Sequence, residues 1–279
     1  QIISDLEFSV CGVGNPKFNP YKLVEALKHT EYDKDENKQK PEPSLLGGIS
    51  TRSTGKTWIS FDKVDFGTEG ADTIHIPIFS FDEELPFEIW EGNPYAEGSE
   101  CLVKATYKAP STYNTYTENV YTLPKRLFGV HKLGFAFTTG LYFQGFYFDQ
   151  TKKALSKLRA LDANVVAGDS FTKTEKAVEQ IGNNVNLDFE NMDFGEEGAI
   201  KITICGKSNT ENNSINIKFF DKDGNSTTQL IEFTHTDSYQ EKTFDLEKIA
   251  GKGKISFVFL PGCNFDFEFG KIKLPVFDI

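Results

Sequence analysis

Short runs in which apolar and polar residues alternate recur along the chain, separated by Gly, Pro, Asn and Asp. Examples are residues 73–78 (Thr-Ile-His-Ile-Pro-Ile) and 201–204 (Lys-Ile-Thr-Ile). Alternation with a period of two residues predicts β-strands. Several such strands, closely spaced and separated by turn residues, predict an all-β antiparallel sandwich rather than alternating strands and helices.

The chain also contains an internal repeat. Residues 64–71 (Val-Asp-Phe-Gly-Thr-Glu-Gly-Ala) match residues 192–199 (Met-Asp-Phe-Gly-Glu-Glu-Gly-Ala) at an offset of 128 residues. Residues 123–137 and 246–259 then match each other in the same order. A shared motif in a shared order indicates two copies of one fold. We therefore expect two tandem antiparallel β-sandwich domains of the jelly-roll type.

The repeat gives approximate domain boundaries. We assign residues 46–150 to the first sandwich and residues 164–279 to the second, with a hairpin tip at Asp223-Gly224. Residues 151–163 are predicted to form a short connector helix that packs against the adjoining module. Its apolar residues have helical spacing: Ala154, Leu155, Leu158 and Leu161. Residues 1–45 are interpreted as an arm and linker from a preceding domain.

Composition narrows the choice of partners. The 279 residues suit two domains, and the 38% hydrophobic fraction is enough for packed cores. A net charge of −11 with no basic patch argues against nucleic acid. No apolar run approaches the roughly 20 residues that cross a bilayer, so we expect no membrane insertion. The chain begins with Gln rather than Met, so we interpret it as a piece of a larger protein.

Sequence signatures of catalysis and of zinc binding are missing. There is no G-x-S-x-G motif, and close pairs among the 41 carboxylates are expected by chance. The four cysteines are far apart in sequence and include no C-x-x-C pair, which argues against zinc. They are Cys11, Cys101, Cys205 and Cys263. We expect free thiols, and a Cys205–Cys263 disulfide remains the alternative.

Several segments of the first copy resemble family 6 and related carbohydrate-binding modules. They are residues 56–61 (Lys-Thr-Trp-Ile-Ser-Phe), 64–71, 86–92 (Pro-Phe-Glu-Ile-Trp-Glu-Gly), 113–116 (Tyr-Asn-Thr-Tyr) and 129–133 (Gly-Val-His-Lys-Leu). Each segment is a weak signal, but their order extends over about 90 residues and recurs downstream. The resemblance implies a jelly-roll β-sandwich that binds carbohydrate.

Other segments resemble the C-terminal region of bacterial glycoside hydrolase family 2 enzymes of the β-galactosidase type. They are residues 2–8, 87–92, 143–148 (Phe-Gln-Gly-Phe-Tyr-Phe) and 181–185 (Ile-Gly-Asn-Asn-Val). This resemblance implies that the catalytic carboxylates lie outside this chain, in a catalytic domain of the same polypeptide. It also implies a secreted or cell-surface bacterial protein, with a cytoplasmic one as the alternative.

The resemblance further implies candidate binding residues. In the family, two aromatic side chains in loops at one end of the sandwich enclose a pyranose ring, and a polar residue of the last strand binds its hydroxyls. The corresponding positions are Trp58 and Tyr113 for the rings, and Tyr142 and Gln144 on the last strand. The family usually has a Phe-Asn-x-Asp pattern there, and the departure to Tyr142 and Gln144 leaves the hydrogen-bonding role open. For Trp58 and Tyr113, a packing role is the competing interpretation.

Two further predictions follow from the alternation and the repeat. Trp90 alternates with Phe87 and Ile89, so it faces solvent or a second, concave-face cleft, or else has a packing role. In the second copy Asn186 stands at the position of Trp58 and Thr236 at that of Tyr113. Because both stacking faces are lost there, we expect the second module to be structural.

Family 6 modules often hold a structural calcium ion. Calcium requires six to eight oxygen ligands. Only scattered candidates such as Asp169 are present, and Gln144 replaces the usual Asp. The sequence thus names no metal site and leaves calcium open.

These observations suggest a noncatalytic region that holds a glycoside hydrolase at its substrate, a β-galactoside or another plant or host glycan. The alternative is a structural or oligomerisation appendage with no glycan binding.

Overall fold

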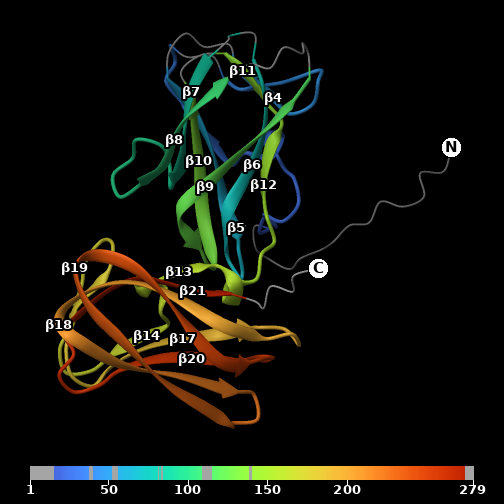
Figure 1. Cartoon of the computed structure of the whole chain (residues 1–279). Helices are drawn as coiled ribbons and strands as arrows, with labels where there is room; N and C mark the ends of the chain where they lie inside the picture. Colours follow the sequence, from blue (N-terminus) through green and yellow to red (C-terminus); the bar gives the residue numbers. More distant parts are fainter. Residues whose placement is uncertain are drawn as a thin grey trace. The chain divides into compact units, whose positions relative to one another are not determined.

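The computed structural model describes residues 16–37, 40–51, 56–80, 82, 84–108, 115–137 and 140–273. The chain divides into two compact units, Gln1–Gln150 and Thr151–Ile279 (Figure 1). Regular structure in the described ranges is β-strand, apart from three single-turn 3₁₀ helices: η1 (Ala26–Lys28), η2 (Lys153–Leu155) and η3 (Ala160–Asp162). None of the helices described is long and apolar enough to span a lipid bilayer.

The first unit contains two antiparallel sheets. One has the strand order β1-β12-β6-β11-β4-β3, with β9 also paired to β6. Its strands are β1 (Val24–Glu25), β3 (Glu42–Pro43), β4 (Ile49–Thr51), β6 (Ala71–Phe79), β9 (Thr117–Leu127), β11 (Leu141–Phe143) and β12 (Gly145–Phe148). The other has the order β2-β5-β10-β7-β8. Its strands are β2 (Glu31–Tyr32), β5 (Thr57–Asp65), β7 (Glu84–Glu91), β8 (Glu100–Lys108) and β10 (Val130–Phe137).

Phenylalanine side chains join these two sheets into a sandwich. Phe61 of β5 and Phe135 of β10 each lie 5.0 Å, centroid to centroid, from Phe146 of β12 in the opposite sheet. All three rings are buried. The alternation that predicted the strands therefore directs one side of each sheet into a common aromatic core. This confirms the predicted antiparallel β-sandwich.

The residues before position 46 contribute to this sandwich. Val24 pairs with Phe146, and Glu31 and Tyr32 pair with β5. Phe18 forms an isolated bridge to Val64. The first sandwich therefore includes strands from the stretch that the sequence assigned to an arm and linker. Residues 1–15 lie outside the described ranges.

In the second unit, a single antiparallel sheet bends over to form both layers. Its order is β14-β17-β20-β18-β21-β16-β15, with β13 paired to β21 and β19 to β18. The strands are β13 (Lys157–Arg159), β14 (Val165–Ala167), β15 (Thr172–Lys173), β16 (Val178–Ile181), β17 (Val185–Asp193), β18 (Ala199–Asp221), β19 (Ser226–Ile249), β20 (Lys252–Phe259) and β21 (Phe265–Lys273). Phe257 and Phe267, which belong to the two layers, have centroids 5.2 Å apart.

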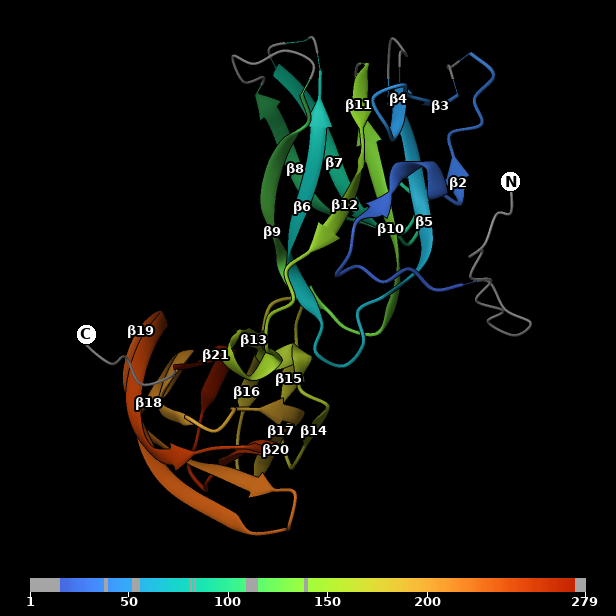
Figure 2. The same ribbon diagram turned by 90° about the vertical axis from the view of Figure 1, so that its right-hand side faces the viewer.

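The length of β18 and β19 makes this bend possible. β18 pairs with β21 along residues 201–208 and with β20 along residues 215–221, so it passes from one layer to the other. β19 follows it through both layers, and Figure 2 shows the two as long, curved ribbons. The predicted hairpin tip at Asp223-Gly224 is confirmed, because Gly224 has a φ of +85° and Phe220 pairs with Ser226.

The predicted connector helix over residues 151–163 is wrong. The segment contains two single 3₁₀ turns and the short strand β13, in which Leu158 pairs with Gly270 of β21. Ala154 and Leu158 are buried within the second unit, so their spacing reflects two separate inward contacts and not a helical stripe. Hydrogen bonding to β21 and burial of these side chains outweigh the helical pattern of so short a segment.

Candidate functional site

Two rows of side chains project from the outer face of the β2-β5-β10-β7-β8 sheet. Register places Trp58 beside Ala136 and Ala136 beside Glu88. The next row contains Ser60, Gly134 and Trp90. Their strand neighbours, such as Ile59 and Phe135, point into the core. The face therefore has indole side chains on β5 and β7 and small residues on the strand between them.

The turn after β7 folds back across the small residues. A Cβ atom added to Gly134 would lie 2.5 Å from both the Gly92 carbonyl oxygen and the Pro94 Cδ atom. Gly92 has a φ of +97°, a conformation that favours glycine and lets the chain reverse. Asn93 accepts a 2.7 Å hydrogen bond from the Ser60 hydroxyl of β5. The turn is therefore fixed against β10 and β5.

This turn presents Tyr95 to solvent. The side chain is 45% exposed, and the residue has a φ of +64°, which is unfavourable for a non-glycine residue. The Tyr95 ring packs edge-on against Trp90, with centroids 5.2 Å apart and an interplanar angle of 65°. The Lys56 Nζ atom lies over the same ring, 5.0 Å from its centroid. Strained backbone that holds an aromatic ring at the surface is typical of binding sites.

Glu88 links the two aromatic residues. Its Oε2 atom accepts a 3.0 Å hydrogen bond from Trp90 Nε1, and its carboxylate also hydrogen-bonds the Tyr95 side chain. Burial, followed by this hydrogen bond, strongly raises the pKa of the Tyr95 phenol. Tyr95 is therefore a neutral hydrogen-bond donor at physiological pH. Glu88 fixes the orientation of both rings.

A polar network borders the aromatic group. Lys132 Nζ contacts Glu31 Oε1 at 2.9 Å and Asp62 Oδ1 at 2.8 Å. Asn93 Nδ2 donates to Glu31 Oε2 at 2.6 Å. These hydrogen bonds, that from Lys132 first, lower the pKa of Glu31. The site thus combines aromatic surface with fixed, half-exposed donors and acceptors, which is the combination that sugar rings and hydroxyls require.

The structure brings together only some of the residues proposed from sequence. Trp58 and Trp90 are half-buried and share the outer face. Tyr142 belongs to β11 of the opposite sheet, where it stacks on Phe79 with centroids 5.0 Å apart. Gln144 lies between β11 and β12, and its backbone nitrogen donates to the Pro77 carbonyl. Tyr113 lies outside the described residues.

Sequence reasoning missed Tyr95. The signal was present, because Asn93-Pro94-Tyr95 follows a predicted strand and reads as a turn. What the sequence does not show is that this turn folds over Gly134 and brings the ring against Trp90. That contact joins positions in β7, β10 and the turn between β7 and β8.

The equivalent face of the second unit has no aromatic residue in the two matching rows. Register gives Asn186, Val258 and Asn216 in one row, and Asp188, Ser256 and Lys218 in the other. Lys254 Nζ forms a 2.9 Å ion pair with Asp188 Oδ2. This face of the second unit therefore lacks the aromatic surface that the first unit has at the matching positions.

The ends of the two sandwiches also differ. In the first unit β8 ends at Lys108 and β9 begins at Thr117, and residues 109–114 between them, Tyr113 included, lie outside the described ranges. In the second unit the matching strand β19 continues without a break. The buried Thr236 occupies the predicted Tyr113 position, and its Oγ1 atom accepts a 3.1 Å hydrogen bond from Ser208 N. At this position the second unit thus has a buried polar contact within a continuous strand.

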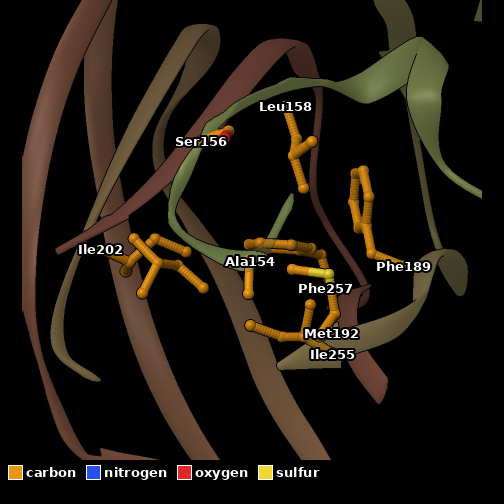
Figure 3. A pocket seen from close by; sticks show the side chains of 10 residues that line it. Ala154, Ser156, Leu158, Phe189, Met192, Ile202, Ile255 and Phe257 are labelled. Atoms are coloured by element: carbon orange, nitrogen blue, oxygen red, sulfur yellow. The ribbon is translucent and has the colours of Figure 1, made fainter. Parts of the chain in front are cut away.

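An apolar cavity lies inside the second unit (Figure 3). Its lining comes from the segment before β14 and from both layers of the sheet: Ala154, Ser156, Leu158, Phe189, Met192, Ile202, Ile255, Phe257, Gly270 and Ile272. Ser156 is the one hydroxyl-bearing residue among them. Sugar recognition requires several fixed polar partners, so this lining does not suit a sugar.

Metal and thiol chemistry find little support in the described ranges. These ranges contain no cluster of three or more His, Cys, Asp or Glu side chains that would hold a metal ion. Asp169 accepts a 3.4 Å hydrogen bond from Asn184. Cys205 and Cys263 are buried and are not bonded to each other. Burial, together with the Glu268 carboxylate, raises the pKa of Cys205 to about 12, so its thiol stays protonated.

Comparisons with known proteins give structural matches alone. No protein-family model and no curated protein sequence matches the chain. CsCBM6-3 from Clostridium stercorarium, solved in complex with cellobiose, is 20% identical with a TM-score of 0.38, covering 44% of this chain and 95% of that one. A family 6 carbohydrate-binding module from Clostridium cellulolyticum, solved with xylose, is 19% identical with a TM-score of 0.38, covering 43% and 98%.

A longer match covers more of the chain. The glycoside hydrolase family 43 arabinoxylan arabinofuranohydrolase from Bacillus subtilis, solved with cellotetraose, is 14% identical with a TM-score of 0.37. The match covers 83% of this chain and 55% of that one. The chain is thus structurally similar to family 6 carbohydrate-binding modules over about 44% of its length.

Proposed function

We propose that this chain is a noncatalytic carbohydrate-binding region of a bacterial glycoside hydrolase, and that its first unit binds glycan on the outer face of the β2-β5-β10-β7-β8 sheet. Tyr95 and Trp90 form the stacking surface, with Trp58 beside them. Glu88 and the Asn93 network supply the polar contacts. The second unit has a structural role.

One observation carries this proposal. Tyr95 is held exposed, at a backbone conformation that costs on the order of 1 kcal/mol or more, and its ring contacts Trp90. A ring that served only to cover the sheet would be expected to be buried, whereas Tyr95 is 45% exposed. The apolar C–H face of a pyranose stacks on such rings, and hydroxyl groups bind the carboxylate and amide groups around them.

The parent enzyme and the sugar are further parts of the proposal. The sequence resemblance to family 2 enzymes of the β-galactosidase type makes β-galactosides the first glycans to test, and it favours a secreted or cell-surface protein. The competing function is a structural or oligomerisation appendage. The polar, internally paired face of the second unit is consistent with such a role for that half of the chain.

Calorimetric titration with galactose, lactose, β-glucan and xylan oligosaccharides tests the proposal. We expect at least one class to bind and Tyr95→Ala to weaken that binding roughly 5- to 30-fold, because an aromatic anchor contributes about 1–2 kcal/mol. Tyr239→Ala is the matched control, since Tyr239 is an exposed tyrosine of the second unit that hydrogen-bonds Glu179. No binding by any oligosaccharide would leave the structural alternative.

A further inference from the structure

The ammonium group of a lysine in the same chain lies over the Tyr95 ring. The exposed Lys56 lies just before β5, and its ammonium group is 5.0 Å from the ring centroid. Aromatic rings attract cations through the negative potential of their faces. Lys56 therefore marks a position where a positive charge is stabilised on the proposed glycan-binding face.

Carboxylates strengthen this preference. Glu88 accepts the Trp90 indole proton and hydrogen-bonds Tyr95. The half-buried Asp33 also acts electrostatically on Tyr95 and, like Glu88, raises its pKa. The Tyr95 ring under the Lys56 ammonium group thus packs against a second aromatic ring and is subject to the negative charge of two carboxylates. This combination is characteristic of sites that recognise ammonium groups.

The second unit has different residues at the positions equivalent to Trp90 and Glu88. The position equivalent to Trp90 is Lys218, and that equivalent to Glu88 is Asn216. Both the ring and the carboxylate are replaced there, the ring by a cation. A lysine also lies over a ring on this face of the second unit, with Lys254 Nζ 4.9 Å from the Phe220 centroid, but that lysine is already paired with the Asp188 carboxylate.

We propose that the outer face of the first unit recognises a protonated amine, so that its preferred ligands are glycans with unacetylated amino sugars such as glucosamine. The inference rests on the proposed function of this face. The sugar ammonium displaces the Lys56 Nζ atom from the Tyr95 ring and pairs with Glu88. Acetylation removes the charge and with it this contact, and uronic acids are repelled by the two carboxylates.

Titration of the full chain with three tetrasaccharides tests this inference. They are β-1,4-linked glucosamine, its N-acetylated form and cellotetraose, used at pH 5.5 so that the amine is protonated. We expect the glucosamine tetramer to bind about 2- to 30-fold more tightly than either neutral tetramer. Added salt should reduce that difference.

Variants separate the charge effect from loss of folding. Lys56→Gln removes the competing ammonium and should tighten glucosamine binding, whereas Lys22→Gln, on an exposed residue that precedes β1 of the opposite sheet, should not change it. Glu88→Gln should abolish the preference for the amine, with thermal unfolding used to confirm an intact fold. Equal affinity for the three tetramers overturns this inference and leaves glycan binding standing. Failure of all three and of the neutral panel overturns both.

Discussion

Gly134 of β10 lies directly beneath Pro94, so that a Cβ atom at position 134 would approach the Pro94 Cδ atom to 2.5 Å. This contact, together with that to the Gly92 carbonyl oxygen, determines how closely the turn carrying Tyr95 approaches the sheet. The position of the exposed Tyr95 ring therefore depends on the absence of a side chain at position 134.

The first prediction follows from this contact. Gly134→Val should push the turn away from β10 and weaken glycan binding as much as Tyr95→Ala does, although no ligand-contacting side chain is altered. Overpacking of this kind costs about 1–3 kcal/mol of stability, so the unit should remain folded. Calorimetry together with circular dichroism measures both effects. Unchanged affinity in a folded Gly134→Val protein would show that the turn does not position the site.

The second prediction concerns the corner of the second unit. Asn213 is fully buried; its Nδ2 donates to Ser208 Oγ, and its Oδ1 accepts a 2.9 Å hydrogen bond from Asn264 N. Asn213→Ala should lower the free energy of unfolding by about 1–3 kcal/mol, because buried partners lose their hydrogen bonds. Urea denaturation is the measurement. Asn212→Ala, on an exposed neighbour, is the control and should have little effect.

The connecting segment gives a third prediction. Leu158 is 5% exposed and lines the apolar cavity, whereas Leu161 is only half-buried. Leu158→Ala should therefore cost about 2–5 kcal/mol of unfolding free energy, and Leu161→Ala clearly less. Denaturant unfolding of the two variants provides the comparison. Equal losses would favour the amphipathic helix that the spacing of these leucines predicts.

The fourth prediction is a dependence of stability on pH. Burial raises the pKa of Glu91, but hydrogen bonds from Lys125 and His131 outweigh it, so the folded-state pKa lies below the ordinary value of 4.5. A group with a lowered pKa contributes stability above its unfolded value, and this contribution is lost as pH falls through the folded value. Unfolding free energy should thus decrease below about pH 4.5.

A variant identifies the group responsible. Glu91→Gln should be less stable at pH 7 and should show a smaller decrease in stability on acidification, whereas Glu197→Gln, in a turn of the second unit, should behave like the parent chain. Parallel curves for Glu91→Gln and the parent protein would exclude Glu91 as the origin of the acid sensitivity.

Much of the architecture was accessible from sequence because it depends on local periodicity. Alternation around residues such as Ile74 and Ile202 gave strands, and the repeated Asp-Phe-Gly motif gave two sandwiches. The connector helix was wrong because Leu158 pairs through its backbone with Gly270, a partner more than a hundred residues away. Local spacing carries no information about such a partner.

The candidate site was accessible only in part for a similar reason. Trp90 could be assigned to an exposed face by alternation and Trp58 to a binding site by the family resemblance, and the structure places both on one sheet. Tyr95 could not be added, since its role depends on Gly134 admitting the turn and on Glu88 orienting both rings. These are contacts across three strands, and they depend on register, which the sequence pattern leaves undetermined.

Nuclear magnetic resonance of the two tryptophan indole groups tests the central claim most directly. The chain contains only Trp58 and Trp90, so each indole N–H signal can be assigned with a single Phe variant. We predict that a bound oligosaccharide shifts the Trp90 signal, with a smaller shift for Trp58, and that Tyr95→Ala raises the ligand concentration needed for both responses by the same factor as it weakens binding. A glycan that binds without moving either indole signal would contradict the proposed site.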